Sequence, residues 1–143
     1  MIRVVLDANV LVSALLGSER SIAPPSVIMR LWLDKAFVVV ISSPLYAEVE
    51  RTVGQPFVVD HVAESRRAQL LQVLSKRADH ATIAVTVEGV ASHPEDDLIL
   101  ATALSAQVDY LVTGDKQLLA RDGYEGLRIV SPRAFLDLLE RTA

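Results

Sequence analysis

Four acidic side chains stand beside apolar or helical segments of this sequence, where carboxylates could together bind a metal ion. Asp7 follows the apolar run VVL, Asp115 follows the apolar stretch 110–113, and Asp96 and Glu48 lie in segments with helical patterns. Two carboxylates about 4 Å apart repel each other by roughly 4 kcal/mol at an effective dielectric near 20. Hard divalent cations such as Mg²⁺ and Mn²⁺ remove that repulsion, because they prefer oxygen ligands. Beside a phosphodiester, such an ion can activate a bound water and neutralise the leaving oxygen.

Each acid also has a purely structural interpretation. Asp7, directly after a strand, can form a turn or cap a helix, and Asp115 within TGDK suits a turn whatever its function. One of Asp96 and Asp97 is expected to cap the helix that the pair opens, because acids in a first turn interact favourably with the helix dipole. The metal hypothesis therefore depends on the joint placement of the acids.

Glu48 has a competitor in Glu50, which lies in the same predicted helix. The apolar stripe of that helix does not choose between them; it consists of Leu45, Val49 and Val53. The histidines lack metal-ligand spacing such as HxxxH, so solvent or packing roles are expected for them; they are His61, His80 and His93.

The elements that must position the acids alternate between strand and helix patterns. Short β-branched runs predict buried strands at 2–7, 37–41, 110–113 and 128–131, and an edge or short strand at 81–87. Helical spacing and start signals predict helices at 9–16, from Pro24 or Pro25 to about 36, 44–53 after a Ser43 cap, 63–78, 95–106, 116–121 and 132–142. Residues 57–62 are ambiguous.

This alternation, with strands that are apolar on both faces, predicts an α/β fold: a three-layer α/β/α sandwich around a mainly parallel sheet. Ligand sites of such folds lie outside the carboxyl ends of the strands. Asp7 and Asp115 belong at that edge, and helices that follow strands begin there, so Glu48 and Asp96 can reach it. Trp32 is expected in the core, and Asn9 is a candidate cap for the first helix.

Composition limits the classes of protein that the chain can be. Its 143 residues, 51% hydrophobic and 22% charged, suit one globular domain spanning 1–143. The absence of cysteine excludes disulfides, thiolate zinc sites and cysteine nucleophiles, and it fits a reducing cytoplasm. Asp7 interrupts any signal-peptide core, and no apolar run is long enough to span a bilayer. A net charge of −4 argues against a generally basic nucleic-acid surface, but not against a cation-binding acidic centre.

Four stretches of the sequence together resemble the PIN domain family, and within it the VapC-like toxins of toxin–antitoxin systems. They are VVLDANVLVSALL (4–16), ISSPLYAEV (41–49), HPEDDLILATALSAQVDYLVTGDKQLL (93–119) and IVSPRAFLDLL (129–139). The resemblance implies the same α/β/α fold and an Mg²⁺- or Mn²⁺-dependent ribonuclease acting on RNA. It also implies a cognate antitoxin and a homodimer. Residues 54–92 carry no strong family signature.

The resemblance assigns the acids by their position in these motifs. The catalytic and metal-binding acids would be Asp7, Glu48, Asp96 and Asp115, which decides against Glu50. Supporting polar residues would be Asn9, Ser13, Asp97 and Thr113, with Asp97 assisting its neighbour or capping the helix. We therefore expect Asp7, Asp96 and Asp115 to hold one Mg²⁺, with Glu48 helping directly or through water. Lys116 could contact the substrate backbone, and Arg121 is a weaker candidate for the same role.

Two other functions are compatible with part of the pattern. An Asp at a strand end can accept a phosphoryl group, as in haloacid-dehalogenase-like or receiver domains, but Asn9 replaces the second Asp of a DxD and the early acidic pair of a receiver is missing. A non-catalytic RNA- or protein-binding module is the other alternative, and the full set of acids argues against it.

Overall fold

A computed structural model describes residues 1–91 and 93–142. Its centre is a five-stranded parallel sheet in the order β3-β2-β1-β4-β5. The strands are β1 (Arg3–Leu6), β2 (Val38–Ile41), β3 (Asp79–His80), β4 (Tyr110–Val112) and β5 (Ile129–Val130). The three central strands are almost entirely buried, in keeping with their runs of β-branched and aliphatic residues.

The helices fill the connections between the strands and follow β5. They are α1 (Ala8–Leu16), α2 (Pro24–Leu33), α3 (Ser43–Val53), α4 (Pro56–His61), α5 (Glu64–Arg77), α6 (Pro94–Ala106), α7 (Lys116–Leu119) and α8 (Pro132–Thr142), with a short 3₁₀ turn at Tyr124–Gly126. All six prolines of the chain lie in the first turn of a helix, where the missing N–H has no partner to lose. Proline therefore marks the starts of α2, α3, α4, α6 and α8.

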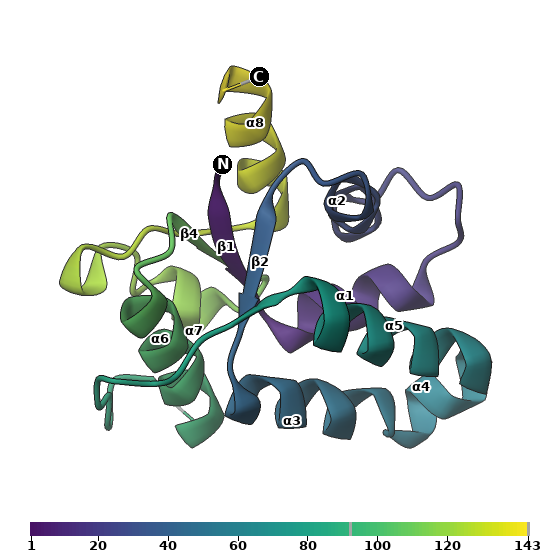
Figure 1. Ribbon diagram of the computed structural model, residues 1–143, viewed down its shortest axis with the longest axis horizontal. Helices are drawn as coiled ribbons and strands as arrows, with labels where there is room; N and C mark the ends of the chain where they lie inside the picture. The colour runs from purple at the N-terminus through teal and green to yellow at the C-terminus, as the bar shows by residue number, and fades with distance from the viewer. Residues whose placement is uncertain (92, 143) are drawn as a thin grey trace.

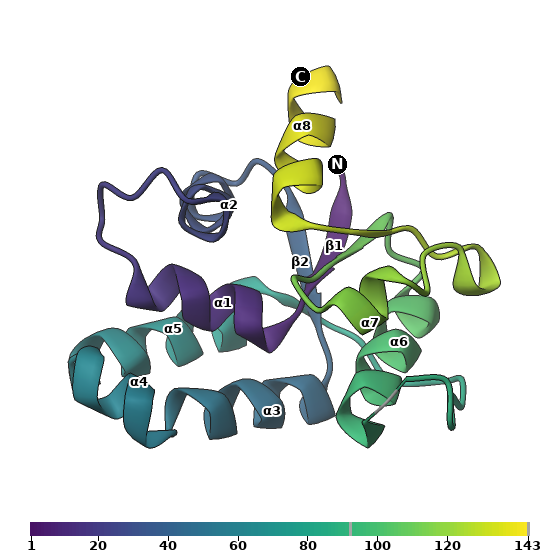
Figure 2. The same ribbon diagram turned by 180° about the vertical axis from the view of Figure 1, so that it is seen from behind.

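The helices divide around the sheet. Figures 1 and 2 show α1, α3, α4 and α5 together on one side of the strands, and α6 and α7 on the other. The N-terminus and helix α8 lie at the same end of the molecule, where β1 begins and α8 packs beside α2 (Figure 1). Phe135 of α8 is fully buried and meets Phe37 edge-to-face, with ring centroids 5.1 Å apart. Trp32, 3% exposed, lies in the same core, as predicted.

The predicted α/β fold with a parallel sheet is confirmed, and most element boundaries agree within two residues. The strand predicted at 81–87 is wrong. The strand in this region is β3, at 79–80, and residues 81–87 have no helix or strand. The predicted Ser43 cap is also wrong: Ser42 caps α3, its hydroxyl accepting from the backbone N–H of Leu45. The ambiguous segment 57–62 forms most of helix α4.

The strand order places a topological switch point between β1 and β4. From β1 the chain proceeds outward to β2 and β3, then crosses back to β4 and β5 on the other side of β1. Ligands of open α/β sheets bind outside the carboxyl ends of strands at such a point. Within the two described stretches, no helix is both long enough and apolar enough to cross a membrane.

Candidate active site

Asp7 and Asp115 meet at the switch point through the hydroxyl of Thr113. The β1–β4 register pairs Leu6 with Val112, which places Asp7 beside Thr113 one residue further on. The Thr113 hydroxyl donates to Asp7 Oδ2 at 2.7 Å and accepts from the backbone N–H of Asp115 at 3.0 Å. Since Thr113 is fully buried, its single proton is committed to Asp7. The Thr113 hydroxyl thus links the Asp7 carboxylate to the backbone of Asp115.

The Asp7 side chain does not cap a helix, although the residue occupies the position before α1. The residue is 4% exposed, and this burial raises the pKa of its carboxyl group above the ordinary value. The hydrogen bond from Thr113 and the nearby backbone amides of Asn9 and Ala8 oppose the rise, while the charge of Asp115 adds to it. Burial and a nearby second acid both disfavour the charged form of a carboxyl group, unless a cation compensates its charge.

Asp96, in the first turn of α6, belongs to the same electrostatic group. Its pKa rises to about 6, first because of burial and then because of the negative charges of Asp7 and Asp115. His93 lowers that pKa and Glu95 raises it. The charges of Asp7 and Asp115 therefore reach Asp96, although the three acids come from separate segments of the chain.

The structure gives Asp115 a second role, as the cap of α7. Its Oδ1 accepts from the backbone N–H groups of Gln117 and Leu118 at 2.8 and 3.3 Å. The structural role of this acid is therefore a helix cap, whereas the sequence analysis had given it the role of a turn residue. It leaves Oδ2 without a hydrogen bond in the described part of the chain, so capping and ligand binding are compatible here.

Asp97 contacts a different segment from the three acids. Its two carboxylate oxygens accept from the backbone N–H groups of Gly89 and Ala91, at 3.0 and 2.7 Å. The residue before α6, His93, makes no side-chain cap either. The capping predicted for one of Asp96 and Asp97 is thus wrong for Asp97, which holds the preceding loop instead.

The side chains of the remaining predicted residues make no hydrogen bond to the three acids in the described part of the chain. Glu48 of α3 is paired with Arg51 one turn on, and its charge is not among those that act on Asp7 or Asp96. Asn9 is an exposed residue within α1, so the prediction that it caps this helix is wrong. Ser13 is exposed on α1, and Lys116 is exposed at the start of α7, directly after Asp115.

Two buried hydroxyls that the sequence analysis did not single out connect α3 with α6. Ser42 and Thr102 lie 2.7 Å apart, and Thr102 donates to the carbonyl oxygen of Leu98. Because that donation uses the Thr102 proton, Ser42 must be the donor to Thr102. Both residues lie in stretches that resemble the PIN domain family, Ser42 in 41–49 and Thr102 in 93–119, and this resemblance was the signal that could have found them.

The acidic oxygens at this edge of the sheet are ligands that suit a hard divalent cation. Burial, and after it the charge of neighbouring acids, raises the pKa of Asp7 and of Asp96. In the described residues, however, no three Asp, Glu, His or Cys side chains stand close enough to hold one ion jointly. Asp7 is engaged by Thr113, and one oxygen of Asp115 by the α7 amides. Binding one ion would therefore require these side chains to rearrange.

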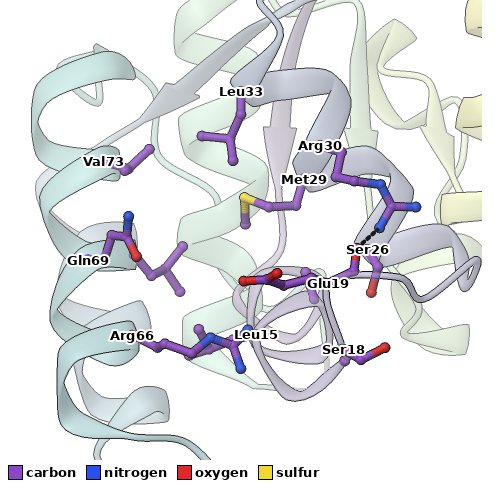
Figure 3. Close-up of a pocket in the computed structure, with 13 residues that line it drawn as sticks. Leu15, Ser18, Glu19, Ser26, Met29, Arg30, Leu33, Arg66, Gln69 and Val73 are labelled. Carbon is purple, nitrogen blue, oxygen red and sulfur yellow. Dashed lines mark hydrogen bonds between the residues drawn. The ribbon is translucent and has the colours of Figure 1, made fainter.

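Two cavities lie away from these acids, and no predicted site residue lines either of them. One, of about 330 Å³, is bounded by the end of α1, by α2 and by α5. Figure 3 shows Arg66 and Gln69 of α5 across from Met29 and Leu33 of α2, with Arg30 bonded to the carbonyl oxygen of Glu19 at 3.1 Å. The other, of about 670 Å³, lies between α2, α8 and the N-terminus.

Comparisons with known proteins agree with this architecture. The structure resembles a chain of the crystal structure of VapBC2 from Rickettsia felis bound to a DNA fragment from their promoter, with a TM-score of 0.60 and 17% identity, over 91% of this chain and 98% of that one. No curated protein matches the sequence significantly. The sequence model of the PIN domain matches residues 3–117, which include all the predicted acids. The chain therefore belongs to the PIN domain family.

Proposed function

We propose that this PIN domain is an Mg²⁺- or Mn²⁺-dependent endoribonuclease that acts as the toxin of a toxin–antitoxin pair. The observation that carries the proposal is the electrostatic grouping of Asp7, Asp96 and Asp115 at the switch point of the sheet. Such a group opposes folding on its own, so it is expected where a bound cation offsets its cost. Membership of the PIN domain family and the likeness to a VapBC2 chain support the same reading.

In this proposal Asp7, Asp96 and Asp115 hold the ion and Glu48 assists, directly or through water. The ion would supply an activated water and neutralise charge on an RNA phosphodiester. Thr113 fixes the Asp7 carboxylate in one orientation and ties it to Asp115. Lys116, exposed beside Asp115, offers a positive charge to the substrate backbone. Asn9 and Ser13, both exposed on α1, would line the approach to the acids.

The proposed partners follow from the same reading. A cognate antitoxin would place an Arg or Lys over the acids, where a positive charge relieves their repulsion. A homodimer is part of the proposal as well. The gene adjacent to this one is the first candidate for the antitoxin, and co-purification of the two products tests it.

The decisive experiment is a cleavage assay with purified protein on mixed single-stranded and structured RNA. We expect cleavage with Mn²⁺ or Mg²⁺, none with EDTA, and none from Asp96→Asn. The matched control is Asp60→Asn, which changes a carboxylate on the exposed surface of α4. Binding of RNA without cleavage at any metal concentration would instead favour a non-catalytic module, and trapping by beryllofluoride would favour a phosphoryl acceptor.

A further inference from the structure

The loop before α6 lies along that helix and is held at two points. We call residues 84–91 the strap. At one end the backbone N–H groups of Ala84 and Val85 donate to the hydroxyl of Ser105, at 2.8 and 3.3 Å. At the other end Gly89 and Ala91 donate to the two carboxylate oxygens of Asp97. Ser105 and Asp97, eight residues apart on α6, thus supply the hydrogen-bond acceptors that a neighbouring strand would otherwise give these N–H groups.

Asp97 is fully committed to the strap. Its side chain is buried, and each of its oxygens accepts one backbone N–H, which is how a buried carboxylate is stabilised without a counter-ion. Gly89 has a φ of +68°, a left-handed conformation that glycine adopts without strain. The conformation of this glycine is therefore part of how the strap meets Asp97.

The two neighbouring acids consequently face different partners. Asp97 binds the strap, whereas Asp96 remains half-buried beside Asp7 and Asp115. The bonds to Asp97 join Gly89 and Ala91 to the first turn of α6, which also carries Asp96. A shift of the strap at these bonds would therefore act on the turn that holds Asp96.

We propose that Asp97 is a positioning residue: by clamping the strap to the first turn of α6, it sets the orientation in which Asp96 meets Asp7 and Asp115. This inference rests on the proposed function, since it gives Asp96 its role as a metal ligand. It assigns Asp97 neither metal binding nor capping.

The test compares Asp97→Asn with Ser105→Ala, the matched variant that releases the far end of the strap. Amide hydrogen exchange and Mn²⁺ titration calorimetry are measured on both and on the wild type. In Asp97→Asn we expect at least tenfold faster exchange at Gly89 and Ala91 and roughly tenfold weaker Mn²⁺ binding, the size typical of a lost outer-shell partner. In Ser105→Ala exchange should rise at Val85, with Mn²⁺ affinity within about twofold of wild type.

Faster exchange in Asp97→Asn with unchanged Mn²⁺ affinity would overturn the proposal, because Asp97 would then be only structural. Loss of Mn²⁺ binding with unchanged exchange would also overturn it, because Asp97 would then be a ligand. If Asp97→Asn does not fold, Gly89→Ala strains the strap without touching the carboxylate, and it should weaken Mn²⁺ binding in the same direction. Wild-type protein that binds Mn²⁺ but cleaves no RNA overturns the proposed function alone; wild-type protein that binds no Mn²⁺ overturns both.

Discussion

At the scale of single residues, Thr113 determines how the acidic group is arranged. Its hydroxyl can donate only once, and the proton goes to Asp7 while the oxygen receives the amide of Asp115. The hydrogen bond from Thr113 opposes part of the rise that burial causes in the pKa of Asp7, because it stabilises the charged form. The charged form of Asp7 therefore still costs free energy in the metal-free protein, and a bound cation would offset that cost.

Asp7→Asn separates the functional interpretation of this residue from the structural one. The amide oxygen of Asn can still accept from Thr113, and the repulsion from Asp115 disappears. We expect metal-dependent cleavage to fall at least about 100-fold, since even outer-shell changes cost 10–100-fold. In EDTA, the free energy of unfolding measured in urea should stay the same or rise slightly. A large loss of stability with activity retained would contradict the assignment.

The raised pKa of Asp96 makes a prediction for the metal-free protein. Its pKa is about 6 in the native state, against an ordinary value of 3.8, which we take for the unfolded chain. Between these two pH values the native state therefore binds a proton that the unfolded state has released. The stability contributed by this group is therefore present at low pH and lost as pH rises from about 4 to 6. Urea unfolding in EDTA should show Asp96→Asn gaining stability relative to wild type over that interval. A constant difference would contradict the electrostatic grouping.

The sequence predicted which acids lie near the switch point, but not what each one contacts. Asp7 and Asp115 each follow a buried strand closely in the sequence. Because these strands are parallel neighbours in the sheet, the two residues lie at the same edge. The partners of Asp97 and Glu48 depend on a loop path and on a rotamer, and neither has a periodic signal in the sequence. Adjacent acids on a helix point in directions about 100° apart, so only the packing of α6 could separate Asp96 from Asp97.

At the scale of elements, the strap shows why a strand-like sequence did not form a strand. Segment 81–87 is rich in β-branched residues, which favours strand structure. Pairing with β2 stops at His80, and further along the segment Ser105 takes the N–H groups of Ala84 and Val85. Contacts with α6 thus outweighed the local strand propensity. Ser105, which makes them, is about twenty residues further along the chain.

The Ser42–Thr102 pair offers a test of how α3 is held against α6. Thr102→Val keeps the side-chain shape but leaves the buried Ser42 hydroxyl without its acceptor, so we expect a loss of about 1–3 kcal/mol in the free energy of unfolding. Ser42→Ala also removes the α3 cap. Because the two hydroxyls contact each other, the losses of the two single variants should sum to more than the loss of the double variant in a double-mutant cycle. Simple additivity within about 0.3 kcal/mol would show that the hydroxyls do not interact.

At the scale of the whole molecule, the fold brings the repulsion between acidic side chains together at one edge of the sheet. Three separate segments deliver Asp7, Asp96 and Asp115 to the carboxyl edge of the sheet, while the opposite end carries the N-terminus and α8. The core around Phe135 and Trp32 stabilises that arrangement independently of any ligand. The apo fold is therefore expected to be stable yet responsive to cations.

Cation binding should raise the stability of the entire domain, because an ion that binds only the native acidic group shifts the unfolding equilibrium by mass action. At a free Mn²⁺ concentration 100 times its dissociation constant, the gain is about 2.7 kcal/mol. Thermal unfolding monitored by circular dichroism should show a midpoint that rises with Mn²⁺ but not with NaCl of equal ionic strength. Asp96→Asn should lose most of this rise, whereas Asp60→Asn should keep it. An equal rise in both variants would place the ion elsewhere on the molecule and remove the main support for a metal-dependent nuclease.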